Sequence, residues 1–323
     1  MHRRRLRRAG ARAKADPSAT ARPHRRPVRS SFIFGHAAGT APKSQGGLLG
    51  RRRRHVLLRD SGVAGGRLRT VVVLYWMSIS HPSQVARKML DLKGIEYELV
   101  DVVPLNQRIH LRLAGFRRGT VPALRLHGRR VQGSRQIARA LDEHWPEPPL
   151  FPTDPALRAR VEQAERWGEE QLQPIPRRLF RYGVARDPQL RQWVVRAQRL
   201  PLPGLTAQAI RPAAEWYLHT VEADGRRATE AGVRADLAAL PALLDRVDRQ
   251  LDDGTLMLDP PNAATLQIMA SVNLMGRFAD LAELVASHAY AEPARELFAG
   301  YRAELPAFLD PGWLEPVRSA LAA

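Results

Sequence analysis

A short polar loop with three serines joins the first apolar run of the chain to its first predicted helix. The loop, residues 78–83, reads SISHPS and follows the apolar run at 71–77. The N-terminus of a helix carries unpaired N–H groups and a partial positive charge, so a hydroxyl placed there can donate to a bound anion. Ser80 has this position, with Ser78 and Ser83 as alternatives. The same position also suits a plain helix cap, and both interpretations stay open.

The composition and the absence of certain motifs exclude several other kinds of catalytic or binding site. The chain has no cysteine, so disulfides, zinc ribbons and a thiolate nucleophile of its own are absent. It has no HExxH, Walker or strand-linked GxGxxG motif, and its ten histidines are scattered. The longest apolar run has seven residues, against about 20 for a helix that crosses a bilayer. We expect no metal, no resident cofactor and no membrane partner.

The net charge of +19 is concentrated at the N-terminus. Residues 1–69 hold 19 Lys and Arg against 2 acidic residues, whereas residues 70–323 have a net charge of only +2. Residues 1–69 show no sustained periodic pattern of hydrophobic residues and are predicted to be a disordered tail. It can be a nucleic-acid-binding tail, an Arg-rich targeting segment, or translated codons upstream of the true start. We favour the last, since the globular pattern begins abruptly, and we expect that removing 1–69 leaves the melting temperature unchanged.

Residues 70–150 show an α/β pattern. The run 71–75 predicts a strand buried on both faces, and apolar residues at spacings of three and four over 85–92 predict a helix that ends at Gly94. A strand at 97–103 is expected to be parallel to the first. The remaining predicted elements are a helix at 106–113, a strand at 123–126, a strand ending at 131 and a helix at 134–141. The order β-α-β-α-β-β-α predicts a thioredoxin-like domain.

Residues 155–323 are predicted to form an all-helical domain. Helices are expected at 161–172, 192–199, 209–221 and 233–251, with Pro174 and Pro176 ending or kinking the first. Asn262 is expected to cap a buried helix. Four aromatic side chains either line an apolar pocket for a co-substrate or pack in the core, and these are Trp167, Phe180, Tyr182 and Trp216.

Three stretches resemble glutathione S-transferases in order and spacing. LYWMSISHPSQVARKMLDLKGIEYELV, residues 74–100, is similar to the first strand, active-site loop and first helix of that family. GTVPALRLHGRRVQGSRQIARAL, residues 119–141, resembles its hairpin and third helix. PPLFPTDPALRARVEQAERWGEE, residues 148–170, resembles the entry into its helical domain. The predicted helical domain is longer than is usual in the family, and the extra length is expected near 183–235.

The resemblance implies roles for several residues. Ser80, in a Ser-His-Pro motif similar to the serine-type members, would stabilise the thiolate of glutathione. The neighbouring His81 either tunes the site or contacts substrate, or it is a structural or exposed residue, which we favour. The Val121–Pro122 bond would be cis, with the backbone of Val121 pairing with the cysteinyl part of glutathione. Ser134 is expected to cap the helix at 134–141. The resemblance implies that it also holds the γ-glutamyl carboxylate at this helix N-terminus, and both roles are compatible.

One position departs from the family pattern. Gly133 stands where Glu or Gln is usual before the serine, and Gln132 lies one place early. The usual side-chain anchor for the γ-glutamyl end is therefore missing. Arg135 would compensate for it unless that guanidinium is simply solvated, which we favour. The departure leaves open whether the chain binds glutathione, a different thiol or no thiol.

These observations support three hypotheses. The leading one is a cytoplasmic, homodimeric enzyme that conjugates glutathione or a related thiol to a small hydrophobic electrophile, with glutathione as co-substrate and no other cofactor. The second is a non-catalytic binding or scaffold protein of the same fold, favoured by Gly133. The third, nucleic-acid binding through the basic tail, is the least favoured.

Overall fold

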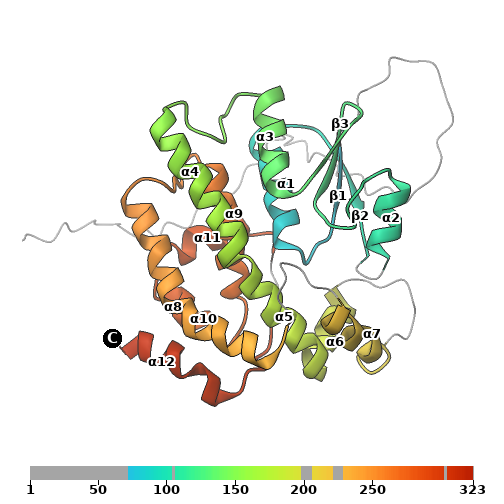
Figure 1. The fold of residues 1–323 in the computed structure, drawn as a ribbon, viewed down its shortest axis with the longest axis vertical. Coiled ribbons are helices and arrows are strands. Elements are labelled where there is room, and N and C mark those ends of the chain that lie inside the picture. Colours follow the sequence, from blue (N-terminus) through green and yellow to red (C-terminus); the bar gives the residue numbers. More distant parts are fainter. Residues whose placement is uncertain (1–71, 104–105, 198–205, 221–227, 302–303, 323) are drawn as a thin grey trace, which may run out of the picture. The chain divides into compact units, whose positions relative to one another are not determined.

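The fold is given by a computed structural model that describes residues 72–322, except 104–105, 198–205, 221–227 and 302–303. The predicted tail at 1–69 lies outside the described residues. From the N-terminal side the elements are β1 (Val73–Trp76), α1 (His81–Leu92), β2 (Glu98–Asp101), α2 (Gln107–Leu113), β3 (Ala123–Leu126), β4 (Arg129–Gln132) and α3 (Ser134–His144). This order confirms the predicted β-α-β-α-β-β-α topology (Figure 1).

The four strands form one mixed sheet in the order β2-β1-β3-β4. Strand β1 is parallel to β2 and antiparallel to β3, and β3 is antiparallel to β4. The parallel pairing of the first two strands confirms the prediction. In this register the end of β1, the start of β3 and the end of β4 meet at one edge of the sheet, because Tyr75 lies opposite Ala123 and Ala123 lies opposite Gln132.

Strand β1 is buried on both faces of the sheet, as its continuous apolar run predicts. Leu74 and Trp76 point into a core shared with α1 and α3. Val73 and Tyr75 point to the opposite face, where they pack with Leu111 of α2 in a smaller cluster. Figure 1 shows α2 on the other side of the sheet from α1 and α3.

The C-terminal part is helical. Its elements are α4 (Pro155–Trp167), a π-helical turn (Gly168–Leu172), α5 (Pro174–Arg186), α6 (Pro188–Ala197), α7 (Arg211–Thr220), α8 (Glu230–Asp252), α9 (Ala263–Met275), α10 (Ala282–Ala286), α11 (Ala291–Leu297), a 3-10 turn (Pro311–Leu314) and α12 (Glu315–Ala322). Where a long helix ending near Pro174 was predicted, α4 passes through the π-helical turn into α5, which begins at that proline.

Helix α9 connects the two parts of the fold. All of its residues are buried, and it packs against α1 and α3 of the sheet domain as well as α4 and α5. The side chain of Asn262 caps it by accepting from the Thr265 backbone N–H at 2.9 Å, which confirms the predicted cap. Since α9 lies against α1, it places the helical part directly behind the loop that carries Ser80.

Candidate functional site

Ser80 is the N-cap residue of α1, between the end of β1 and the first helical turn. Its hydroxyl oxygen accepts a hydrogen bond from the Ser83 backbone N–H at 3.4 Å. Accepting this bond leaves the proton of the hydroxyl for a further acceptor. Ser80 is half-buried, whereas Ser83 is fully buried inside α1 and its hydroxyl accepts from the Met77 N–H at 3.4 Å. Of these two serines, only Ser80 can therefore reach a ligand.

His81 follows Ser80 as the first residue of α1, and its imidazole is buried. Burial lowers the pKa of His81 well below its ordinary value, and the positive charge of Arg177 on α5 lowers it further. The ring is therefore neutral at physiological pH. Its Nε2 atom is buried and has no hydrogen-bond partner among the described residues. A buried polar atom without a partner is rare in native proteins, so it is a candidate contact for a bound molecule.

The helical part also contacts this loop through Tyr301. Its buried hydroxyl donates to the Ile79 carbonyl oxygen at 3.1 Å, immediately before Ser80. Burial raises the pKa of Tyr301, so the hydroxyl keeps the proton that it donates. The sequence gives no local signal for this contact, because the two residues lie more than 200 positions apart. Tyr301 therefore fixes the backbone that presents the Ser80 hydroxyl.

We predict that Tyr301→Phe slows any reaction that uses Ser80 by about fivefold, since a lost neutral hydrogen bond is worth about 1 kcal/mol. The matched control is Tyr290→Phe. Tyr290 is also buried and donates to a backbone carbonyl at 3.1 Å, but its acceptor is Leu244 on α8. Both variants should lose similar stability, and only Tyr301→Phe should lower the turnover rate. Equal rates in the two variants would show that Tyr301 has a structural role alone.

The Val121–Pro122 bond is cis, as predicted, and it lies just before β3. The Gly133 N–H donates to the Pro122 carbonyl at 2.9 Å, which ties this turn to the end of β4. Gln132 holds the preceding loop: its amide accepts from the Arg118 N–H at 2.9 Å and donates to the Arg118 carbonyl at 2.7 Å. Because the Gln132 side chain is bonded to this loop, it does not replace the missing side-chain anchor for the γ-glutamyl group of glutathione.

The start of α3 differs from the prediction. The helix begins at Ser134, and the N-cap position is taken by Gly133, which makes no side-chain cap bond. The expectation that Ser134 caps the helix is therefore wrong. Gly133 has φ = +93°, a conformation that side chains rarely adopt, and this favours glycine where the family has Glu or Gln. The Ser134 hydroxyl is buried and donates to Gln267 of α9 at 2.8 Å, and the Gln267 amide in turn donates to Gln173.

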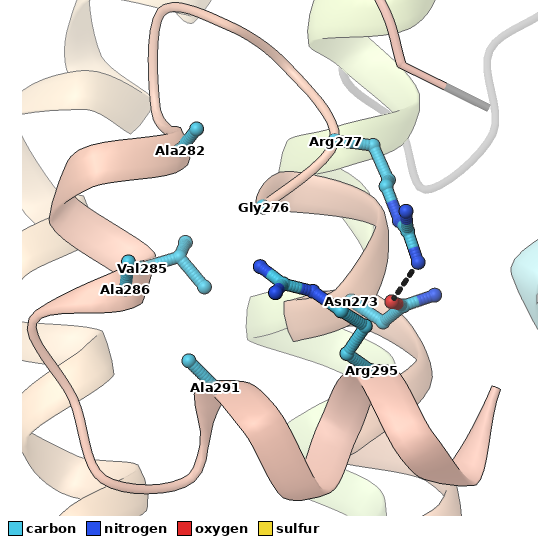
Figure 2. A pocket seen from close by; sticks show the side chains of 8 residues that line it. All are labelled: Asn273, Gly276, Arg277, Ala282, Val285, Ala286, Ala291 and Arg295. Atoms are coloured by element: carbon cyan, nitrogen blue, oxygen red, sulfur yellow. Dashed lines mark hydrogen bonds between the residues drawn. The ribbon is translucent and has the colours of Figure 1, made fainter. Parts of the chain in front are cut away.

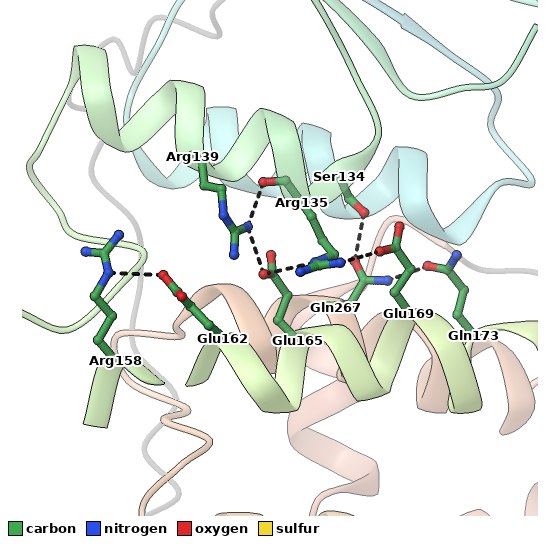
Figure 3. Close-up of polar contacts among 9 residues, drawn as sticks. All are labelled: Ser134, Arg135, Arg139, Arg158, Glu162, Glu165, Glu169, Gln173 and Gln267. Atoms are coloured by element: carbon green, nitrogen blue, oxygen red, sulfur yellow. Dashed lines mark hydrogen bonds and ion pairs between the residues drawn. The ribbon is translucent and has the colours of Figure 1, made fainter. Parts of the chain in front are cut away.

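Arg135 is not solvated as we favoured, because two acidic side chains hold it. Its guanidinium contacts Glu165 at 3.3 Å and Glu169 at 3.0 Å, and Arg139 contacts Glu165 at 2.8 Å. Figure 3 shows the two arginines of α3 pointing toward these glutamates on the facing helical segment, beside the Ser134–Gln267 bond. The Ser134 and Arg135 side chains at the start of α3 therefore make contacts with the helical part.

Of the two alternatives for the four aromatic side chains, the structure favours core packing over a co-substrate pocket. Trp167 is buried beneath the Arg246 guanidinium, Phe180 packs against Trp193, and Tyr182 packs against Trp313. The Trp216 side chain lies outside the described residues. These three aromatic side chains therefore contribute to the packing of the helical part.

A hollow between the end of α9, α10 and α11 is too small for an organic substrate. It has Asn273, Arg277 and Arg295 on one side and small apolar side chains on the other (Figure 2). Its volume of about 10 Å³ is what one water molecule needs.

The structure thus places the predicted residues along one edge of the sheet. Ser80 follows β1, Val121 and Pro122 precede β3, and Gly133 follows β4. Sequence reasoning missed Tyr301, Gln267 and the two glutamates, which all come from the helical part. The fold is that of a thioredoxin-like domain whose Ser80 loop is supported by an all-helical region.

Comparison with known proteins identifies the family of this domain. Residues 74–149 match the family model described as "Glutathione S-transferase, N-terminal domain". The resemblance to glutathione S-transferases is therefore confirmed over these residues. No curated protein matches the chain.

Solved structures of similar fold include three bacterial and plant proteins. A glutathione S-transferase from Rhodospirillum rubrum F11 is 17% identical, with 76% of this chain and 99% of that chain covered and a TM-score of 0.45. The beta-etherase LigF from Sphingobium sp. strain SYK-6 is 19% identical, with 78% and 99% covered and a TM-score of 0.48. Glutathione transferase F2 from Populus trichocarpa is 16% identical, with 78% and 100% covered and a TM-score of 0.47. The family assignment rests on residues 74–149.

Proposed function

We propose that this protein is a glutathione S-transferase-like enzyme that activates the thiol of glutathione, or of a related thiol, for attack on a small hydrophobic electrophile. The observation that carries the proposal is the half-buried Ser80 hydroxyl, whose oxygen already accepts the Ser83 N–H and whose proton remains available. A thiolate is the reactive form of a thiol. A donor at the N-terminus of α1 stabilises that form through a hydrogen bond and the helix dipole.

The remaining contacts to the thiol would come largely from backbone. The Val121 peptide, beside the cis proline, can pair with the cysteinyl part of the ligand as an added strand does. The first N–H groups of α3 can hold a carboxylate, because a helix N-terminus suits an anion. The side chains of Ser134 and Arg135 contribute little, since their contacts lie within the protein. His81 Nε2, which is buried and without a partner among the described residues, would form a hydrogen bond with the ligand or with water.

Further features of the proposal follow from the family. We propose a homodimer that acts in the cytoplasm without a cofactor other than the thiol substrate. Among the described residues, no helix is both long and apolar enough to cross a membrane. The electrophile would bind beside Ser80, on the side of the helical part.

A second function is favoured by the start of α3. Gly133 lacks a side chain there, while Ser134 and Arg135 are committed to α9 and to Glu165 and Glu169. A protein that keeps the fold but binds no thiol would have this arrangement. The alternative is a non-catalytic binding or scaffold protein.

Thermal melting with glutathione distinguishes the two functions. A ligand at 100 times its dissociation constant stabilises the protein by about 2.7 kcal/mol, and we expect the melting temperature to rise by roughly 5–10 °C. Cysteinylglycine lacks the γ-glutamyl carboxylate that the α3 N–H groups would hold, so it should give a smaller shift. The absence of a shift with either thiol at 10 mM, a concentration on the order of 100 times a 0.1 mM dissociation constant, would favour the scaffold.

A further inference from the structure

Helix α2 presents two aliphatic side chains to the surface. Ile109 is 65% exposed and Leu113 is 84% exposed. They lie four residues apart on the same face of the helix. The one other exposed large hydrophobic side chain in the described part of the chain is Met257, at 36%. Single exposed aliphatics are ordinary, but two neighbours on one short helix mark a surface that contacts something.

The same surface is strongly basic. Residues 106–132 contain seven arginines and no acidic residue, and of these arginines Arg129 is paired with Glu143 of α3, away from α2. The remainder of 70–323 has a net charge of −5, so the positive charge of the folded part is concentrated in this segment. We call the exposed side chains of residues 108–118 together with Arg130 the α2 face.

Two glycines allow the arginines to pack closely around α2. Gly119 lies directly against Arg108, and Gly115, which has φ = +84°, lies against the Arg130 guanidinium. Arg130 also donates to the Ala114 carbonyl at 3.1 Å, at the end of the helix. Beside it, a hollow of about 340 Å³ is lined by Gly115, Phe116, Arg117, Arg118, Arg130 and Gln132. The basic groups therefore lie on α2 and at its C-terminal end, beside the helix that carries the exposed aliphatics, and they leave a recess for an anionic group.

The base of the α2 face is firmly packed. Leu111 is fully buried between Tyr75 and Phe116, and the Phe116 N–H donates to the Leu111 carbonyl at 2.9 Å. The exposed aliphatics therefore do not fold inward by a small rotation of the helix, because Leu111 already fills the space beneath it.

We infer that the α2 face binds the surface of an anionic phospholipid bilayer. Peripheral binding to a bilayer requires two signals: basic side chains for the headgroups and apolar side chains for the acyl boundary. The arginines supply the first signal, with room for a headgroup phosphate in the recess, and Ile109 and Leu113 supply the second. The expectation of no membrane partner rested on the lack of a spanning run, which peripheral binding does not need.

Other occupants fit the α2 face less well. Binding of single-stranded nucleic acid uses exposed aromatic rings for stacking, and Phe116 is buried. The centre of a protein interface is rich in aromatic side chains, whereas the two exposed apolar side chains of the α2 face are both aliphatic. The inference is independent of the thiol chemistry, since it uses none of the residues around Ser80.

Co-sedimentation of the full chain with vesicles tests the inference. The vesicles are phosphatidylcholine alone, or phosphatidylcholine with 30% phosphatidylserine, a content on the order found in PS-rich leaflets. We expect binding to the anionic vesicles alone. Each basic side chain near such a surface contributes about fivefold to binding. Arg112→Glu/Arg117→Glu should therefore weaken binding by at least about tenfold, and Ile109→Ser/Leu113→Ser should weaken it by about tenfold.

The controls separate the α2 face from the basic tail, which remains in every variant. Arg249→Glu/Arg318→Glu makes the same change of charge on exposed positions of α8 and α12, and Met257→Ser removes the other exposed apolar side chain. Both controls should bind as the unmodified chain does, and all variants should keep their melting temperature. Equal binding by all chains would assign the affinity to the tail and overturn the inference. So would a lack of binding, or full binding by Ile109→Ser/Leu113→Ser.

Discussion

Asp236→Ala is expected to lower the free energy of unfolding by about 3–5 kcal/mol. Asp236 of α8 accepts two hydrogen bonds from Arg178 of α5, at 2.5 and 2.6 Å, and both side chains are almost fully buried. Truncating the carboxylate leaves a buried guanidinium charge without its partner. The loss is a large part of the 5–15 kcal/mol that stabilises a typical protein. Urea unfolding followed by circular dichroism measures it.

Two controls test whether the uncompensated charge causes the loss. Glu162→Ala removes one partner of an exposed pair on α4, where Arg158 and Glu162 lie 3.1 Å apart, and should change the free energy of unfolding by less than about 1 kcal/mol. Arg178→Met/Asp236→Leu removes both buried charges and should recover most of the stability. If the double variant is as unstable as Asp236→Ala, then packing at the α5–α8 contact, and not the charge, explains the effect.

The fold was predictable wherever local patterns carry the information. The buried run 71–75, the spacing of three and four in α1, and the two short strands at 123–126 and before 132 each depend on neighbours in the sequence. The interruption between α4 and α5 was less predictable. Gly168 packs against Ile268 of α9 with no room for a side chain, and this tertiary contact lies at the first residue of the π-helical turn.

The site was less predictable than the fold, because more of its contacts join residues that lie far apart in the sequence. The positions of Ser80, Val121 and Pro122 follow from strand ends, which the sequence shows. The contacts of Arg135 and Ser134 depend on side chains 30 and 133 residues away. The positive φ of Gly133 could have been predicted, because a glycine between a strand and a helix often has this conformation. Nothing in the local sequence around Tyr301 indicates that its hydroxyl supports the Ser80 loop.

Ser80→Ala should slow thiol conjugation about tenfold or more near neutral pH. A hydrogen bond to a charged group is worth about 1.5–3 kcal/mol, and each 1.36 kcal/mol corresponds to one pKa unit. Without the Ser80 donor, the pKa of the bound thiol should rise by roughly one to two units, so less thiolate is present at pH 7. Thiol affinity should change much less, because the Val121 backbone and the α3 N-terminus contact other parts of the ligand.

The pH dependence of the rate separates thiolate stabilisation from capping. Ser80→Ala should regain rate as pH rises, because alkali ionises the thiol without the donor. Loss of the cap alone lowers stability by about 1 kcal/mol but does not shift this profile. Ser80→Asp keeps a capping oxygen but places a negative charge beside the sulfur, so α1 should stay stable while conjugation remains slow. Ser80→Thr keeps the hydroxyl and should retain most activity. If Ser80→Ala reacts at the unmodified rate at every pH, Ser80 is only a cap, and Ser78→Ala and His81→Ala become the variants that locate the activating group.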